Sequence, residues 1–209
     1  MGIKYKKTAE EILRSLAAIL LALVIGAVFI LVSGESPLTA YGALLKGALG
    51  SPQAIANSIS KSVPLAFTGL AVAMGQRCGM LNIGAEGQLH AGAMAAVITA
   101  LTLSFLPSFL LLTVSIGAGI LAGMAVGSVP GIFRAKYKTN EVIVAIMLNY
   151  ICTLFTSWLV NGPYKVAGST AQTELISEGI WFRKLLPRTQ LTTAVLILIV
   201  VAVLVYLFL

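Results

Sequence analysis

Long apolar runs separated by short polar segments dominate the chain and predict a bundle of membrane-spanning helices. The runs are continuous, whereas the strands of a membrane β-barrel are about ten residues long and alternate in polarity. We therefore expect an all-α, polytopic transmembrane helix bundle with about six spans. The apolar runs cover 12–33, 63–75, 85–105, 108–133, 141–160 and 191–209.

The run over 63–75 is shorter than the others, and the segment after it is interrupted by glycines and polar residues. A helix needs about 20 apolar residues to cross a bilayer. Residues 79–90, GMLNIGAEGQLH, include the single histidine of the chain. Short or glycine-interrupted apolar segments are the best sequence indicator of a transporter's binding site. We expect a discontinuous helix near 76–84, placed either at a cytoplasmic turn or within the membrane.

Two longer polar segments separate the runs. Residues 34–53 contain apolar positions that could form one face of a short interfacial helix. These positions are Tyr41, Leu44, Leu45 and Leu49. Residues 161–190 are expected to form a polar loop.

Composition supports a membrane protein. The chain is 58% hydrophobic and 10% charged, with a mean hydropathy of +0.98, whereas an ordinary soluble domain is about 25% charged. So few charges cannot build a water-soluble surface. We predict a single transmembrane domain over 1–209, in contact with membrane lipid.

The net charge of +7 does not indicate nucleic-acid binding, because the basic residues lie at the ends of apolar runs, where they determine topology. Six crossings with a cytoplasmic N-terminus place slightly more basic residues inside than outside. The inside set is Lys4, Lys6, Lys7, Arg14, Arg77, Arg134, Lys136 and Lys138. The outside set is Lys46, Lys61, Lys165, Arg183, Lys184 and Arg188. If 63–75 and 85–105 were halves of one crossing, the later orientation would invert.

The polar stretch contains candidate residues for a solute path. On one continuous helix, Asn82, Glu86 and His90 would share a face, and Gln88 would lie off it. A glutamate in hydrocarbon is costly unless it faces water, protein or a polar ligand. The alternative is structural: Asn82 caps a helix that begins at residue 83 or 84, and Glu86 favours the positive end of its dipole.

The run over 108–133 carries small residues every four positions. They are Ser115, Gly119, Gly123, Gly127 and Gly131, which share one helix face. Without side chains on that face, another helix backbone can approach closely. The stripe fits a tightly packed transport core as well as ordinary membrane-helix packing.

The next run begins with a helix-capping pattern, in which Thr139 or Asn140 is the expected cap and Glu141 lies in the first turn. Asn149 falls near the middle of the same run. An amide at that depth usually faces the bundle interior. It could bond to another helix or line a path.

No catalytic or metal centre is expected. Cys78 and Cys152 lie apart and are interpreted as small hydrophobic residues, and His90 has no partner at metal-ligand spacing. The sequence has no phosphate-binding loop, nucleophile elbow or HExxH motif. Any nucleotide that powers transport must therefore bind to another chain.

Two segments, GQRCGMLNIGAEGQLHAGAMAA and YKTNEVIVAIMLNYI, resemble the membrane permeases of bacterial ABC importers for ribose, simple sugars and branched-chain amino acids. The nucleoside or simple-sugar uptake permeases are the most similar subgroup. The resemblance covers essentially the whole chain. It carries over Asn82, Gly84, Glu86, Gly87 and Gln88 from the first motif and Asn140, Glu141 and Asn149 from the second.

The resemblance implies a permease that alternates access in the bacterial cytoplasmic membrane, with its N-terminus inside. It also implies a second permease subunit, two cytoplasmic ATPase subunits that bind ATP, and an extracytoplasmic protein that delivers a small polar solute. Members of this family are considerably longer, with a cytoplasmic loop that docks onto the ATPase and several further spans. We therefore expect this chain to be an N-terminal part, or to need another chain for the rest.

Two other functions remain open from the residues alone. One is an ion- or proton-coupled secondary transporter that uses Glu86 and His90 as its coupling pair. The other is a non-transporting membrane fragment that only packs with partners.

Overall fold

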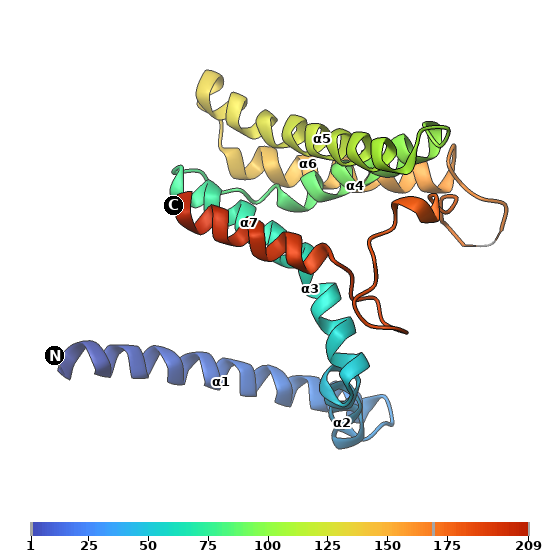
Figure 1. The fold of residues 1–209 in the computed structure, drawn as a ribbon. Helices are drawn as coiled ribbons and strands as arrows, with labels where there is room; N and C mark the ends of the chain where they lie inside the picture. Colours follow the sequence, from blue (N-terminus) through green and yellow to red (C-terminus); the bar gives the residue numbers. More distant parts are fainter. Residues whose placement is uncertain (1, 169, 209) are drawn as a thin grey trace. The chain divides into compact units, whose positions relative to one another are not determined.

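The computed structural model describes residues 2–168 and 170–208, with side chains from residue 12 onward. Within these ranges it contains α-helices, one short 3-10 helix and no strands (Figure 1). The prediction of an all-α membrane helix bundle is confirmed. The helices are α1 (Gly2–Val32), α2 (Pro37–Leu49), α3 (Pro52–Arg77), α4 (Ala85–Thr102), α5 (Ser108–Tyr137), α6 (Glu141–Asn161), η1 (Glu178–Ile180) and α7 (Ala194–Phe208).

Three helical segments among the described residues are long and apolar enough to cross a membrane: Ile12–Val32, Ser108–Tyr137 and Glu141–Asn161. The apolar helix α7 is shorter. The run at 63–75 lies inside α3, whose N-terminal half is polar, and the run at 85–105 corresponds to α4, which begins with polar residues. These two helices therefore combine a membrane-like half with a half that can contact polar groups.

The chain divides into two compact units, Met1–Ser58 and Ile59–Leu209. In the first unit α2 packs against α1, and the Tyr41 hydroxyl donates a hydrogen bond to the Leu23 carbonyl at 2.7 Å. A Cβ added at Gly26 would lie 2.7 Å from that hydroxyl, so glycine leaves the space for it. Tyr41, expected to lie on an interfacial face, thus fastens α2 to α1. The side chains of Lys4, Lys6 and Lys7 lie outside the described part.

The core of the second unit is the group α4, α5 and α6, in which each helix packs against the other two (Figure 1). The backbones of α4 and α5 meet at two glycines: a Cβ added at Gly92 would lie 2.9 Å from the Gly119 carbonyl oxygen. A Cβ at Gly119 would lie 3.0 Å from the Gly92 carbonyl oxygen. The glycine stripe of α5 therefore faces α4, as close helix packing requires.

The segment between α6 and α7 folds back onto the helices. Ile180 in η1 is buried in one apolar cluster with Ala100 of α4 and Leu111 of α5, and Ile176 packs against this cluster. The indole nitrogen of Trp181 donates to the Ile176 carbonyl at 3.1 Å, which stabilises the fold of this segment. The expected polar loop thus carries apolar anchors that cover one end of the α4–α5 pair.

The connection between α5 and α6 is shorter than the gap between the apolar runs at 108–133 and 141–160, because α5 continues to Tyr137. Lys138 has a φ of 52° and ends α5 in the left-handed conformation, with its backbone N–H donating to the Arg134 carbonyl. The Asn140 side chain then accepts a hydrogen bond from the Val142 N–H at 2.9 Å, so the predicted cap of α6 is confirmed. The two helices are held together by a tight turn.

Candidate functional site

The candidate site is built on the break between α3 and α4. α3 ends at Arg77 and α4 begins at Ala85, which confirms the predicted discontinuity near 76–84. Gly79 takes a positive φ of 72°, and the Met80 N–H donates to the Gly75 carbonyl at 2.9 Å. The chain therefore turns back against the end of α3 before it enters α4, and glycine is suited to the conformation that starts the turn.

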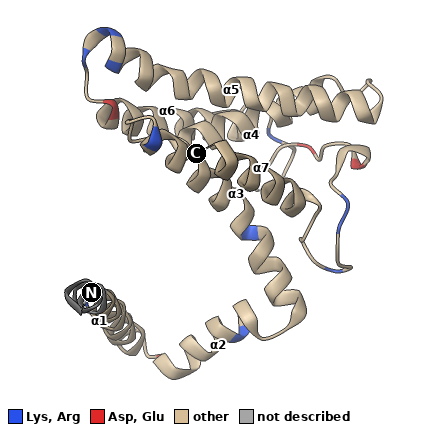
Figure 2. Ribbon diagram, turned by 60° about the vertical axis from the view of Figure 1, so that its left-hand side comes forward, with Lys and Arg blue, Asp and Glu red and all other residues tan. Residues whose placement is uncertain are grey.

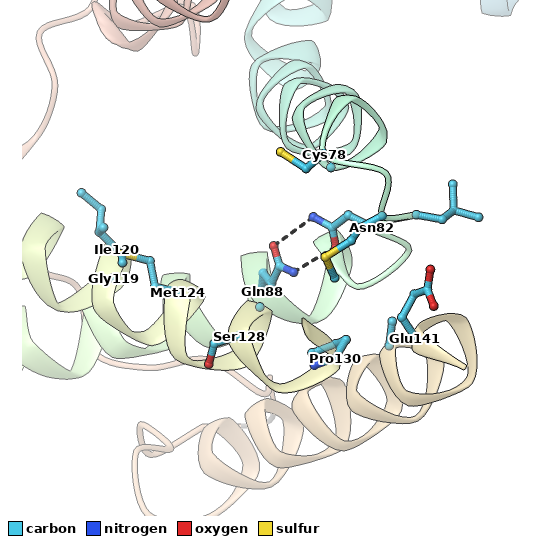
Figure 3. A pocket seen from close by; sticks show the side chains of 15 residues that line it. Cys78, Asn82, Gln88, Gly119, Ile120, Met124, Ser128, Pro130 and Glu141 are labelled. Atoms are coloured by element: carbon cyan, nitrogen blue, oxygen red, sulfur yellow. Dashed lines mark hydrogen bonds between the residues drawn. The ribbon is translucent and has the colours of Figure 1, made fainter. Parts of the chain in front are cut away.

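Asn82 and Gln88 pair with each other across this turn. The Gln88 amide nitrogen donates to Asn82 Oδ1 at 3.0 Å, and the Asn82 amide nitrogen donates to Gln88 Oε1 at 3.4 Å (Figure 3). The prediction that Asn82 shares a helical face with Glu86 and His90 is wrong, because α4 begins after Asn82. Its expected capping role is also wrong, because Gly84 occupies the N-cap position without a side-chain cap. Two amides are self-complementary, and this explains why Asn82 turns toward Gln88.

Asn149 of α6 spans the far end of the break. Its Oδ1 accepts from the Gly87 N–H at 2.8 Å, and its amide nitrogen donates to the Ile83 carbonyl at 2.9 Å. A Cβ added at Gly87 would lie 2.8 Å from that Oδ1 and 3.0 Å from the Asn149 Cα. Asn149 therefore bonds between helices and satisfies backbone groups at the start of α4, which have no partner within the helix. Gly87 permits this close approach.

Glu86 and His90 lie one turn apart on α4, and neither has a hydrogen-bond or ion-pair partner among the described residues. Both line a cleft of about 720 Å³ that faces the apolar half of α3. Glu86 also lines a cleft of about 390 Å³ together with Asn149, Tyr150 and Thr153 of α6. Glu86 therefore lines both clefts, and its carboxylate is an acceptor of hydrogen bonds.

A third cleft, of about 520 Å³, lies on the side of the break where Asn82 and Gln88 pair (Figure 3). Glycines of α5 form one wall, so their missing side chains provide room as well as close packing. Cys78 of the break and Glu141 of α6 also line this cleft. Cys78 is exposed just beyond the end of α3, whereas Cys152 is buried in α6.

Sequence reasoning treated Arg134 only as a topology signal and missed its contacts. Its Nη1 donates to Glu141 Oε1 at 2.6 Å and to the Gly79 carbonyl at 2.8 Å. Figure 2 shows the basic residues at the α5–α6 turn beside the acidic start of α6. Opposite charges seven residues apart could have indicated the ion pair, but no local pattern points to Gly79, which is 55 residues away.

The chain is similar to known membrane permeases. Residues 54–209 match the model of a family described as a branched-chain amino acid transport system / permease component. The chain is 34% identical to the nucleoside ABC transporter permease protein NupB of Lactococcus lactis over 83% of this chain and 49% of that relative. It is 37% identical to the guanosine ABC transporter permease protein NupP of Bacillus subtilis over 74% of this chain and 44% of that relative.

A third relative, the glucose ABC transporter permease protein TsgB13 of Haloferax volcanii, is 35% identical over 69% of this chain and 38% of that relative. The chain thus spans about half or less of the length of these relatives. No solved structure matches. Because the family model covers most of the chain and includes the break, α4, α5 and α6, the chain belongs to the family of branched-chain amino acid transport system permease components, which are transport subunits of the membrane.

Proposed function

We propose that this chain is part of the permease subunit of an ABC importer that moves nucleosides or simple sugars by alternating access. The observation that carries the proposal is the family match over 54–209, joined by relatives whose names specify nucleoside, guanosine or glucose permeases. ATP would bind to partner ATPase subunits, and a second permease subunit and an extracytoplasmic binding protein would complete the system. The proposed location is the bacterial cytoplasmic membrane, with the chain crossing several times and its N-terminus inside.

The polar residues of the candidate site divide into two roles under this proposal. Asn82, Gln88 and Asn149 use their amides within the protein, so they shape the break. Glu86 and His90 have no such partner and line clefts, so they are the groups we assign to the solute path. A carboxylate that accepts hydrogen bonds suits the hydroxyl groups of a ribose or hexose and the N–H groups of a nucleobase.

The importer assignment is tested by uptake of labelled nucleosides, glucose and ribose into cells that carry the intact transport system. We expect nucleoside or sugar uptake to be lost when the gene for this permease is deleted, and an ATPase subunit to copurify with the tagged permease. Unchanged uptake of all three solute classes after deletion would contradict the assignment. If the tagged permease purifies without any ATPase subunit, an ion-coupled transporter is favoured instead.

Replacing Glu86 with glutamine preserves the shape of the side chain but removes its charge. A hydrogen bond to a charged group contributes about 1.5–3 kcal/mol. We therefore expect uptake at limiting solute concentration to fall at least about tenfold. Glu178→Gln is the matched control, because Glu178 lies in η1, away from both clefts that Glu86 lines. Equal uptake by both variants, with equal amounts of assembled permease, would exclude Glu86 from the path.

A further inference from the structure

We infer that Arg134 is a positioning residue that ties the break between α3 and α4 to the α5–α6 turn, so that the two segments move together. Arg134 lies in the last turn of α5, Glu141 is the first residue of α6, and Gly79 lies in the break. A single guanidinium nitrogen serves both acceptors, at 2.6 Å and 2.8 Å. One side chain therefore joins the neighbouring ends of α5 and α6 to the break, which is 55 residues away in the sequence.

The contact pattern indicates a local tie, with little contribution to the stability of the whole fold. The Arg134 side chain is 42% exposed and that of Glu141 is 19% exposed, and ion pairs with this degree of solvent access contribute little to global stability. The packing of α4 on α5 rests instead on the close approach of Gly92 and Gly119. Loss of the Arg134 contacts should therefore release the break and leave the α4–α6 core folded.

The tie acts on the segment that leads into the candidate path. Arg134 holds the break at Gly79, and Asn149 holds it at Ile83 and at the start of α4. Glu86 follows in the first turn of α4. A displacement of the α5–α6 turn would therefore also displace Glu86, because the backbone between them is hydrogen-bonded at Gly79 and at Ile83. This consequence for transport rests on the proposed function, whereas the tie itself does not.

The neighbouring basic residues offer a matched control. Lys136 would serve equally well as a topology signal, but its ammonium group lies 5.6 Å from the centre of the Tyr137 ring, with no contact to the break among the described residues. If Arg134 only directed membrane insertion, Lys136→Gln and Arg134→Gln would behave alike. If Arg134 positions the break, only Arg134→Gln should disturb it.

Cys78 is a built-in reporter, because its exposed thiol is next to Gly79 in the sequence. In the intact permease solubilised in detergent, with Cys152 and any cysteine outside residues 1–209 replaced by alanine, the rate of maleimide labelling measures how freely Cys78 is reached. We expect labelling to rise at least about threefold in Arg134→Gln, because Cys78 lines the cleft beside the break and a released break gives the reagent freer access to this cleft, and to rise less in Arg134→Lys. Lys136→Gln should label as the parent does, and all variants should keep the same thermal unfolding midpoint within about 2 °C.

Uptake by the intact system gives the second measurement. For Arg134→Gln we expect the maximal rate to fall at least about fivefold while the half-saturating solute concentration stays within about twofold, because the solute-contacting groups are retained. If Cys78 is labelled at the parent's rate in both Arg134→Gln and Arg134→Lys, Arg134 does not hold the break. If the Arg134→Gln protein does not accumulate in cells, a parent-like rate of Cys78 labelling in Arg134→Lys is by itself enough to contradict the proposal. Increased labelling with unchanged uptake would uphold the tie and contradict its role in transport.

Discussion

Replacing Gly92 with alanine is expected to lower the free energy of unfolding of the permease by about 1–3 kcal/mol, the usual cost of overpacking a close contact. The added methyl group would lie 2.9 Å from the Gly119 carbonyl oxygen, closer than real contacts allow. The obstacle is backbone rather than a flexible side chain, so α4 and α5 must move apart. Unfolding of the purified permease in mixed detergent micelles, followed by tryptophan fluorescence or helicity, measures the change.

Gly117→Ala is the matched control for this prediction. Gly117 lies on α5 near Gly119, but a Cβ added there has nothing within 4 Å. Alanine is favoured over glycine in a helix by about 1 kcal/mol, so this variant should be as stable as the parent or slightly more stable. Equal stability of Gly92→Ala and Gly117→Ala would show that the α4–α5 backbones do not make the contact described above.

Asn149→Leu is expected to have the second large effect, a loss of about 1–3 kcal/mol of stability together with faster amide exchange at Gly87. The change removes the acceptor for the Gly87 N–H and the donor for the Ile83 carbonyl, and leucine supplies neither. Hydrogen bonds between membrane helices average only about 0.6 kcal/mol. Most of the cost should therefore come from the two backbone groups left without partners.

Asn149→Asp separates the two bonds, because a carboxylate still accepts from the Gly87 N–H but cannot donate to the Ile83 carbonyl when ionised. Exchange at Gly87 should remain slow in this variant and rise in Asn149→Leu. Thr153→Val is the control: it lies one turn further along α6, lines the same cleft, and has no hydrogen bond to the break among those described. If Asn149→Leu exchanges at Gly87 as slowly as Thr153→Val, Asn149 does not hold the start of α4.

Together these variants distinguish three ways in which the structure holds the candidate site. Gly92 and Gly119 set the separation of α4 and α5, Asn149 fixes the start of α4 against α6, and Arg134 fixes the other end of the break. Each contact joins segments that are distant along the chain. The position of Glu86 depends on all three, because it follows the break directly in the first turn of α4.

Features with a short-range cause could be read from the sequence alone. Apolar runs long enough to cross a membrane predicted α1, α5 and α6, and the Asn140 cap followed from the residue types at one helix start. The four-residue spacing of the α5 glycines placed them on one face, although it did not say which helix they meet. Family motifs were also recognisable from the order of residues alone.

Only the tertiary structure decided which polar groups of the site find partners. Residues four positions apart share a face only where one helix is continuous, because each residue turns the helix by about 100°. Since α4 begins at Ala85, Asn82 lies outside the helix and off the face expected to carry Glu86 and His90. The partners of Asn149 lie 62 and 66 residues away, and Gly79 lies 55 residues from Arg134. Local periodicity contains no information on such pairs, because they depend on how separate helices pack. The sequence by itself therefore determined the helices and the candidate residues, and packing decided which of them hold the break and which have no partner within the described part of the chain.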